Sequence, residues 1–310
     1  LYVFIYSGTL LLGNLSMWLT INKHITRIPF KELKIIKHLK PTLILFFPQI
    51  AISIYTVLDK LMIGLITNNT TQIGYYEQAQ KIIKLSLTVV TSLSTVMLPR
   101  IAHLYANDDQ EKIIDYTKKS LQYTLAISCP IMFGIMGIAT NLIPWFLGDE
   151  FIPSINILFV TSPILVFIGI SNIVGFQYLI PTQRQKIYTL STILGSVVNL
   201  CLNCILIPYL LSFGAAIASV AAELSVDLFQ LVCIRKEINF VDVIKKSKSY
   251  FIASFVMFIG IYLLSKHLYP SVMMTAILIA IGGIIYLVML LILRDELLFG
   301  TVKKILKRRS

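Results

Sequence analysis

The sequence predicts an all-α fold, a polytopic membrane helical bundle of about nine transmembrane helices. Of its 310 residues, 56% are hydrophobic and only 14% are charged, whereas an average soluble domain is about 25% charged. Such a chain has too few polar groups to cover the surface of a soluble domain. Its apolar residues form long runs separated by short basic stretches, which is the pattern of transmembrane helices.

Each of these apolar runs is long enough to cross a hydrocarbon core of about 30 Å at about 1.5 Å per residue. Helices are required because lipid offers no hydrogen-bond partner to an exposed backbone. The predicted spans are 1–20, 42–66, 76–104, 120–147, 154–180, 188–211, 213–234, 250–268 and 271–293.

Lysine and arginine predict the orientation of these spans. Nine threaded spans place 23 of the 27 Lys and Arg residues on one side: Arg100 at the end of the third span, and the others in the loops after the first, third, fifth and seventh spans and in the C-terminal tail. Because basic loops remain in the cytoplasm, we predict a multi-pass membrane protein with a cytoplasmic C-terminus. The net charge of +12 is therefore a topology signal and does not indicate a nucleic-acid partner.

The first basic loop, 22–40, alternates apolar and basic residues. This pattern predicts an amphipathic helix on the inner leaflet. An ordinary charged loop is the alternative.

The sequence carries none of the short motifs of enzyme or cofactor sites. It has no Walker A loop, no Gly-rich dinucleotide loop and no metal-ligating cluster. Cys129, Cys201, Cys204 and Cys233 lie within apolar runs and lack zinc-ligand spacing, so they are predicted to be small buried hydrophobic residues. We therefore predict no enzyme activity, no cofactor and no metal.

Polar residues recur at helical spacing within four of the predicted spans, so each set lies along one helix face. A charge near the bilayer centre costs at least about 2.5–3.5 kcal/mol, so charged stripes indicate a wet cavity. The candidates for a substrate-binding cavity are Asp59, Lys60, Glu77, Lys81, Lys84, Gln49, Asn199 and Asn203. The candidates for ion coupling are Asp59, Glu223 and Asp227.

Each stripe has a structural alternative. The charged residues can form structural ion pairs or lie near the membrane interface, Asn199 and Asn203 can bind helices together, and either acid of the seventh span can be a buried hydrogen-bonded group. For the cavity, the spacing predicts that Asp59 balances one lysine of the third span. Glu77 should support Lys81 one turn away, which would leave a net positive wall.

Four blocks of sequence resemble a known family. LDKLMIG at 58–64, GYYEQAQKI at 74–82, MLPRI at 97–101 and FGAAIASVAAE at 213–223 are similar to the polysaccharide transporter family. These proteins are Wzx-type flippases of lipid-linked oligosaccharides, within the MOP exporter superfamily.

This resemblance implies two six-helix lobes around a central cavity, followed by two further helices. Residues 1–40 would then hold the last helix of the N-terminal lobe and the amphipathic linker between lobes. Residues 41–235 would form a MATE-like C-terminal lobe, and residues 236–310 the additional helix pair and a basic cytoplasmic tail. The first five helices of the N-terminal lobe would precede this sequence.

The implied function is translocation of undecaprenyl-pyrophosphate-linked oligosaccharide repeat units for capsule, exopolysaccharide or O-antigen synthesis. Implied partners are membrane lipids, a polysaccharide polymerase and its chain-length machinery. A murein-precursor flippase or a cation-coupled multidrug exporter of the same superfamily is the near alternative. A membrane glycan polymerase or ligase is the enzyme alternative, which the short predicted outer loops disfavour.

Overall fold

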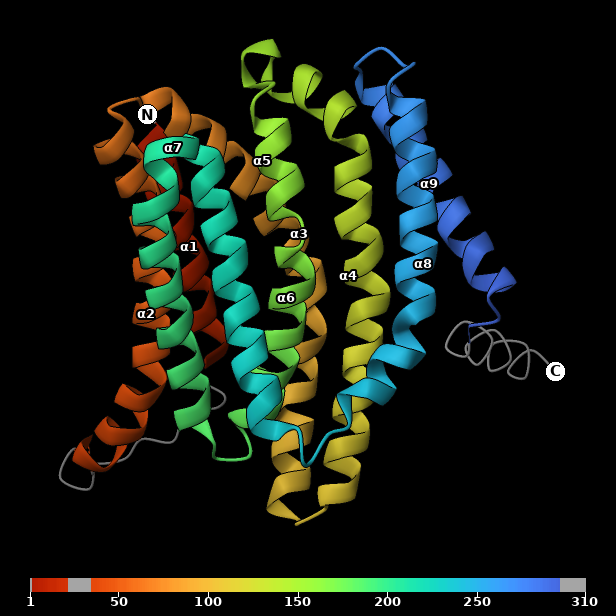
Figure 1. Cartoon of the computed structure of the whole chain (residues 1–310). Helices are drawn as coiled ribbons and strands as arrows, with labels where there is room; N and C mark the ends of the chain where they lie inside the picture. Colours follow the sequence, from red (N-terminus) through yellow and green to blue (C-terminus); the bar gives the residue numbers. More distant parts are fainter. Residues whose placement is uncertain (1, 22–34, 296–310) are drawn as a thin grey trace. The chain divides into compact units, whose positions relative to one another are not determined.

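The computed structural model describes residues 2–21 and 35–295, and all of the secondary structure in these ranges is helical (Figure 1). The predicted all-α fold is therefore confirmed. The chain divides into two compact units, 1–43 and 44–310, which are described separately. The first contains α1 (Tyr2–Ile21) and the start of α2 (Ile35–Thr67). Most of the predicted amphipathic linker, 22–34, lies outside the described residues, whereas 35–40 are the first turns of α2.

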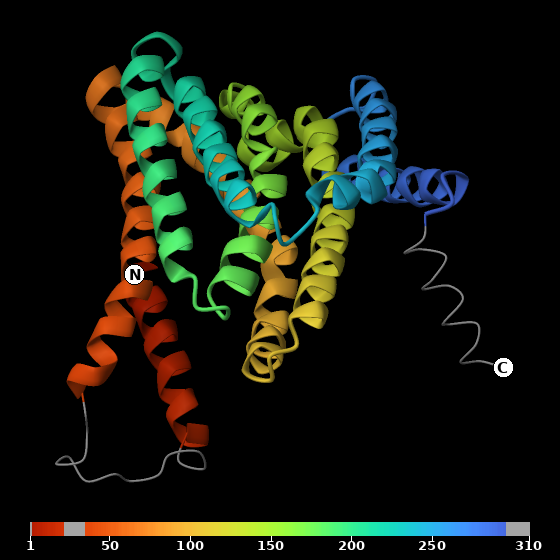
Figure 2. The same cartoon turned by 60° about the horizontal axis from the view of Figure 1, so that its bottom comes forward.

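The second unit begins within α2 and continues with a long hairpin of α3 (Thr70–Ala106) and α4 (Gln110–Leu147) (Figure 2). The side chain of Asn69 starts α3 by accepting a hydrogen bond from the Thr71 backbone N–H at 2.9 Å. Near the hairpin turn, the Arg100 guanidinium stacks on the Tyr116 ring, 4.2 Å from its centroid. The charged stretch after α3 is largely helical because the Asp109 side chain caps the start of α4, accepting from the Lys112 backbone N–H.

The predicted span 154–180 consists of three consecutive pieces. These are α5 (Ser154–Thr161), α6 (Ile164–Ser171) and the π-helix η3 (Asn172–Leu179). Pro163 interrupts the backbone hydrogen bonding between the first two. A π-helix is rare and is found mainly at functional sites.

Helix α7 (Gln185–Ile234) contains two of the predicted spans. Its backbone leaves the helical conformation at Leu211, where φ is +54°, so the chain reverses between two helical segments. Pro208 precedes this reversal, and the Ser212 hydroxyl donates to the Gln72 side chain at 2.6 Å. The predicted boundary between spans 188–211 and 213–234 is thus correct.

The last two helices, α8 (Phe240–Ser265) and α9 (Val272–Ile292), pack against α4. Gly137 of α4 allows close approach, because a Cβ there would lie 3.1 Å from the Ile261 side chain. Trp145 donates to the Thr275 hydroxyl at 2.7 Å, and Tyr286 donates to the Ala126 carbonyl at 2.7 Å. These hydrogen bonds fix the additional pair to the rest of the unit.

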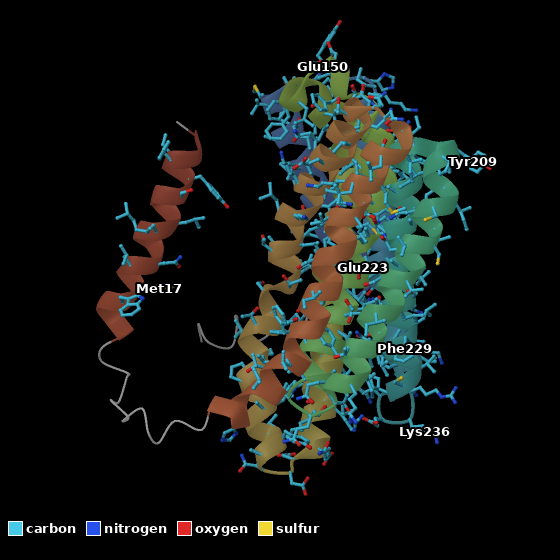
Figure 3. The ribbon with its side chains drawn as sticks, turned by 90° about the vertical axis from the view of Figure 1, so that its left-hand side faces the viewer. Met17, Glu150, Tyr209, Glu223, Phe229 and Lys236 are labelled. Carbon is cyan, nitrogen blue, oxygen red and sulfur yellow. The ribbon has the colours of Figure 1, made fainter. Side chains whose placement is uncertain are left out.

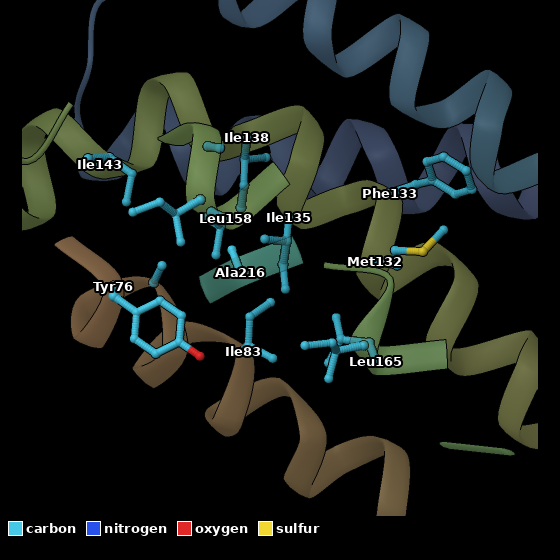
Figure 4. Packing of buried hydrophobic residues seen from close by; sticks show 14 of the residues in the cluster. Tyr76, Ile83, Met132, Phe133, Ile135, Ile138, Ile143, Leu158, Leu165 and Ala216 are labelled. Carbon is cyan, nitrogen blue, oxygen red and sulfur yellow. The ribbon is translucent and has the colours of Figure 1, made fainter. Parts of the chain in front are cut away.

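A central apolar cluster joins α3, α4, α5, α6 and the second segment of α7. Figure 4 shows Ile83 of α3 opposite Leu158 and Leu165, with Ile135 and Ala216 completing the contact. Many large apolar side chains face outward, including Leu65, Leu85 and Val96. This arrangement is expected when lipid, and not water, covers the surface.

Six helices of the described residues are long and apolar enough to cross a membrane: α3, α4, the α5–η3 stretch, α7, α8 and α9. Since α7 contains two segments, they accommodate seven of the predicted spans. Helices α1 and α2 coincide with the other two, and the count of nine remains a prediction. Cys129 is buried, but Cys201, Cys204 and Cys233 are exposed, so their predicted burial is wrong. They lie on outward helix faces, which are as apolar as the buried faces, so the sequence does not distinguish the two.

Figure 3 shows Glu150 and Tyr209 at one end of the second unit and Lys236 at the other. At the Lys236 end, Glu237 joins the connectors before and after α7. Its carboxylate accepts from one guanidinium nitrogen of Arg184, at 2.6 and 2.7 Å, and from the hydroxyl of Tyr178. Burial acts to raise the pKa of Glu237, but these hydrogen bonds and the guanidinium charge hold that pKa below its ordinary value.

Replacing Glu237 by Gln should therefore destabilise the full-length protein by about 1 kcal/mol at neutral pH, since the group is partly exposed. When the pKa of a carboxyl is lower in the folded than in the unfolded protein, its contribution to stability is complete above the unfolded-state pKa. That contribution is lost as the pH falls through the folded-state pKa. The difference in Tm between wild type and variant in detergent should thus shrink as the pH is lowered. Glu111→Gln, at an exposed position, is the control. A difference that is constant with pH would contradict this role.

Candidate functional site

A buried polar cluster surrounds Asp59 of α2. Its carboxylate accepts hydrogen bonds from the Tyr76 hydroxyl at 2.6 Å, the Asn203 amide at 2.6 Å and the Ser219 hydroxyl at 2.8 Å. Asp59 is 2% exposed, so these donors replace water around it. Asn203 also donates to the Asn199 side chain at 3.0 Å. The cluster joins α2, α3 and both segments of α7.

The reversal of α7 brings together the cluster residues of its two helical segments. Asn203 and Ser219 are equally far along the chain from Leu211, so the antiparallel segments carry them at the same depth. Asn199 lies one turn from Asn203, on the same helix face. The sequence therefore determines this pairing once the turn is placed.

The ion pairs differ from the predicted arrangement. Glu77 contacts Lys60 at 3.2 Å and Lys81 at 3.9 Å, so its predicted support of Lys81 is confirmed. The prediction that Asp59 balances a lysine is wrong: within the described residues, Asp59 makes no salt bridge. Consecutive residues point about 100° apart around a helix. Asp59 consequently contacts Tyr76 of α3 and Asn203 of α7, whereas Lys60 contacts Glu77 of α3.

A cavity of about 70 Å³ opens beside this cluster. Such a volume holds a few water molecules. Four of its lining residues are charged, and they come from three helices: Asp59 and Lys60 from α2, Lys84 from α3 and Glu223 from α7. The other lining residues are Tyr76, Gln80, Leu87, Ile164, Ile168 and Ser219.

The predicted net positive wall is wrong by count, because two carboxylates and two lysines line the cavity. Glu223 produces this balance, since the second segment of α7 turns it toward the same space. Glu77 and Lys81 lie beside the cavity through the ion pairs to Lys60 and to each other, and Lys81 is 58% exposed. The charge of the cavity thus depends on the protonation of its acids.

The remaining predicted residues lie around this space. Asn199 and Asn203 are buried within the Asp59 cluster, and Asp227 is buried one turn beyond Glu223. The side chain of Gln49 lies outside the described residues. Sequence reasoning missed Tyr76 and Gln80, which are hydrogen-bonded at 3.0 Å. They recur one turn apart within the block GYYEQAQKI, and that spacing was the available signal.

Comparison with known proteins now adds to this geometry. The profile of a family described as "Polysaccharide biosynthesis protein" matches residues 8–156. A Haloferax volcanii protein described as a low-salt glycan biosynthesis flippase, Agl15, is 24% identical over 55% of this chain and 35% of its own length. A Shigella dysenteriae protein described as an O-antigen transporter is 24% identical over 74% of this chain and 57% of its own.

This chain is similar to proteins described as polysaccharide and lipid-linked glycan flippases. The lipid II flippase MurJ of Bacillus subtilis is 23% identical over 67% of the chain and 41% of its own length. A solved lipid II flippase MurJ, in an inward closed conformation, shares the fold, with a TM-score of 0.72 and 22% identity over 93% of this chain and 61% of that one. The chain thus spans between about a third and three fifths of the length of these flippases.

Proposed function

We propose that the protein containing this chain translocates lipid-linked oligosaccharide repeat units across the bacterial plasma membrane, as a transporter and not as an enzyme. The observation that carries the proposal is the cavity within the helical bundle that both Lys60 and Lys84 line. Lysines act as point-charge partners of phosphate groups. The relatives described as a glycan flippase and an O-antigen transporter support this substrate class.

The substrate combines an undecaprenyl tail, an anionic pyrophosphate and a polar glycan. Its transfer requires cations for the phosphates and a hydrated path for the head group. In the proposed domain organisation, residues 1–40 end the first lobe, 41–235 form the second lobe and 236–310 add a helix pair. Rocking of two lobes around a midplane site would give alternating access. An inside-negative potential favours outward movement of the anion by roughly 2.3 kcal/mol per charge per 100 mV.

Deletion of the intact gene tests the proposal directly. Cells that lack the protein should accumulate an undecaprenyl-pyrophosphate glycan on the cytoplasmic leaflet, and the wild-type gene should reverse this. Accumulation of a murein precursor would favour the alternative suggested by the MurJ relatives. Loss of drug resistance without lipid accumulation would favour the drug exporter. Accumulation of single repeat units on the outer leaflet would indicate a polymerase defect.

We also expect the Lys236 end to be cytoplasmic, because the basic loops predict it. Single cysteines replacing Lys236 and Thr70, both at exposed positions, should then react oppositely with an impermeant maleimide in intact cells. The background protein should lack the four native cysteines. Labelling of the Lys236 position from outside would reverse the topology.

A further inference from the structure

Asp227 is a buried acid that no side chain of the described residues compensates. It lies on the second segment of α7 and is 2% exposed. Neither of its carboxylate oxygens forms a hydrogen bond within the part of the chain that the structure describes. An ionised carboxylate in that position loses its hydration and gains nothing in exchange. The Asp59 cluster differs, because three donors compensate that carboxylate.

A second acid and an unused acceptor accompany Asp227. Glu223 lies one turn earlier and lines the cavity, about midway along the second unit in Figure 3. Gln230, less than one turn later, is fully buried; its amide nitrogen donates to Ser191 at 2.9 Å, but its oxygen has no hydrogen-bond partner among the described groups. A protonated carboxyl at Asp227 would present an O–H donor on the helix face that carries this oxygen.

The other titratable groups around the pair are few. Tyr188, on the first segment of α7, faces Glu223. Across the cavity lie Asp59, Lys60, Tyr76 and Lys84 from α2 and α3. The sequences of α5, α6 and η3 hold one titratable residue, Tyr178, which is bonded to Glu237. From α6, the backbone amide of Ser171 faces Asp227.

We propose that Glu223 and Asp227 form a proton-binding site in which the two carboxyls hold one proton between them. Two acids one turn apart in a buried place do not both ionise readily. A calcium ion fits less well, because it takes about six to eight oxygen ligands. The carboxylates and the Gln230 oxygen supply fewer.

This proton would set the charge of the cavity, and here the inference rests on the proposed function. With Glu223 neutral, two lysines face one carboxylate, and the cavity favours an anion such as pyrophosphate. With Glu223 ionised, the charges balance. Proton and anion binding would therefore strengthen each other, by the same factor in both directions.

Infrared difference spectroscopy of the purified full-length protein in lipid tests the site without requiring transport. A change of pH should reveal the stretching band of a protonated buried carboxyl. Asp227→Asn, which preserves shape, should abolish the band, and Asp227→Glu should shift it. Asp295→Asn is the matched control, because Asp295 is also buried but accepts from Ser249 at 2.7 Å. That variant should keep the band.

Persistence of the band in Asp227→Asn would overturn the proposal while leaving the flippase function intact. Replacement of choline by sodium at constant pH should leave the band unchanged, and its disappearance would show a cation site instead.

Inorganic pyrophosphate should bind wild type about tenfold more tightly at low than at high pH. In Glu223→Gln this pH dependence should be lost, and its retention would overturn the coupling. Thermal unfolding verifies that each variant is folded.

Discussion

Replacing Lys84 by Ala in the full-length protein should lower glycan export by about 10- to 100-fold. Lys84 of α3 lines the same cavity as Asp59 and Glu223. A hydrogen bond to a charged group contributes about 1.5–3 kcal/mol, and about 1.4 kcal/mol corresponds to tenfold. Lys84→Arg should retain more activity because it keeps the charge, although the two side chains differ in shape. The measurement is the amount of surface glycan per protein inserted in the membrane.

Lys81 provides the matched control on the same helix. It is largely exposed and pairs with Glu77, but it does not line the cavity. Lys81→Ala should therefore reduce export less than Lys84→Ala does. The reduction in Lys60→Ala should be intermediate, because the Lys60 charge is partly neutralised by its ion pair with Glu77. Equal, near-normal export in all three variants would show that these lysines only anchor helices.

The apolar runs determined most of the fold that the sequence predicted. The boundary near 211 was predicted from the two apolar runs, and the structure reverses there, after Pro208. The break of 154–180 into α5, α6 and η3 was not found. The mean hydropathy of this segment is continuously high, so the two breaks do not appear in it, although Pro163 was an available signal for the first.

The sequence predicted which residues form the candidate site better than it predicted the contacts between them. Asp59, Lys60, Lys84 and Glu223 do line one cavity. Their pairing was missed because it depends on the rotation of each helix about its axis. In lipid, apolar residues occur on every face, and small or polar residues set the rotation instead. Contacts within one helix, such as Glu77 with Lys81, follow from spacing alone.

Replacing Asp59 by Ala should destabilise the full-length protein by about 3–5 kcal/mol. The change removes the acceptor of three buried donors, those of Tyr76, Asn203 and Ser219. Each buried donor left without a partner costs about 1–3 kcal/mol. The cavity that the truncated side chain leaves between α2 and α7 adds to this cost. The expected result is a much lower Tm in detergent and poor accumulation in the membrane.

Asp59→Asn separates the structural role of this residue from its charge. It keeps one carbonyl acceptor and adds an amide donor, which the Tyr76 and Ser219 hydroxyls can accept, so most stability should remain. If Asp59 also serves ion coupling, as the sequence predicts, Asp59→Asn should be folded but defective in export. Asp115→Ala is the control, since Asp115 forms an exposed pair with Lys119 and should change neither property. An Asp59→Ala protein as stable as wild type would mean that the polar cluster does not hold α2 to α7. In that case the polar cluster would not determine the depth and rotation of α2, and so would not explain why Lys60 lies at the cavity.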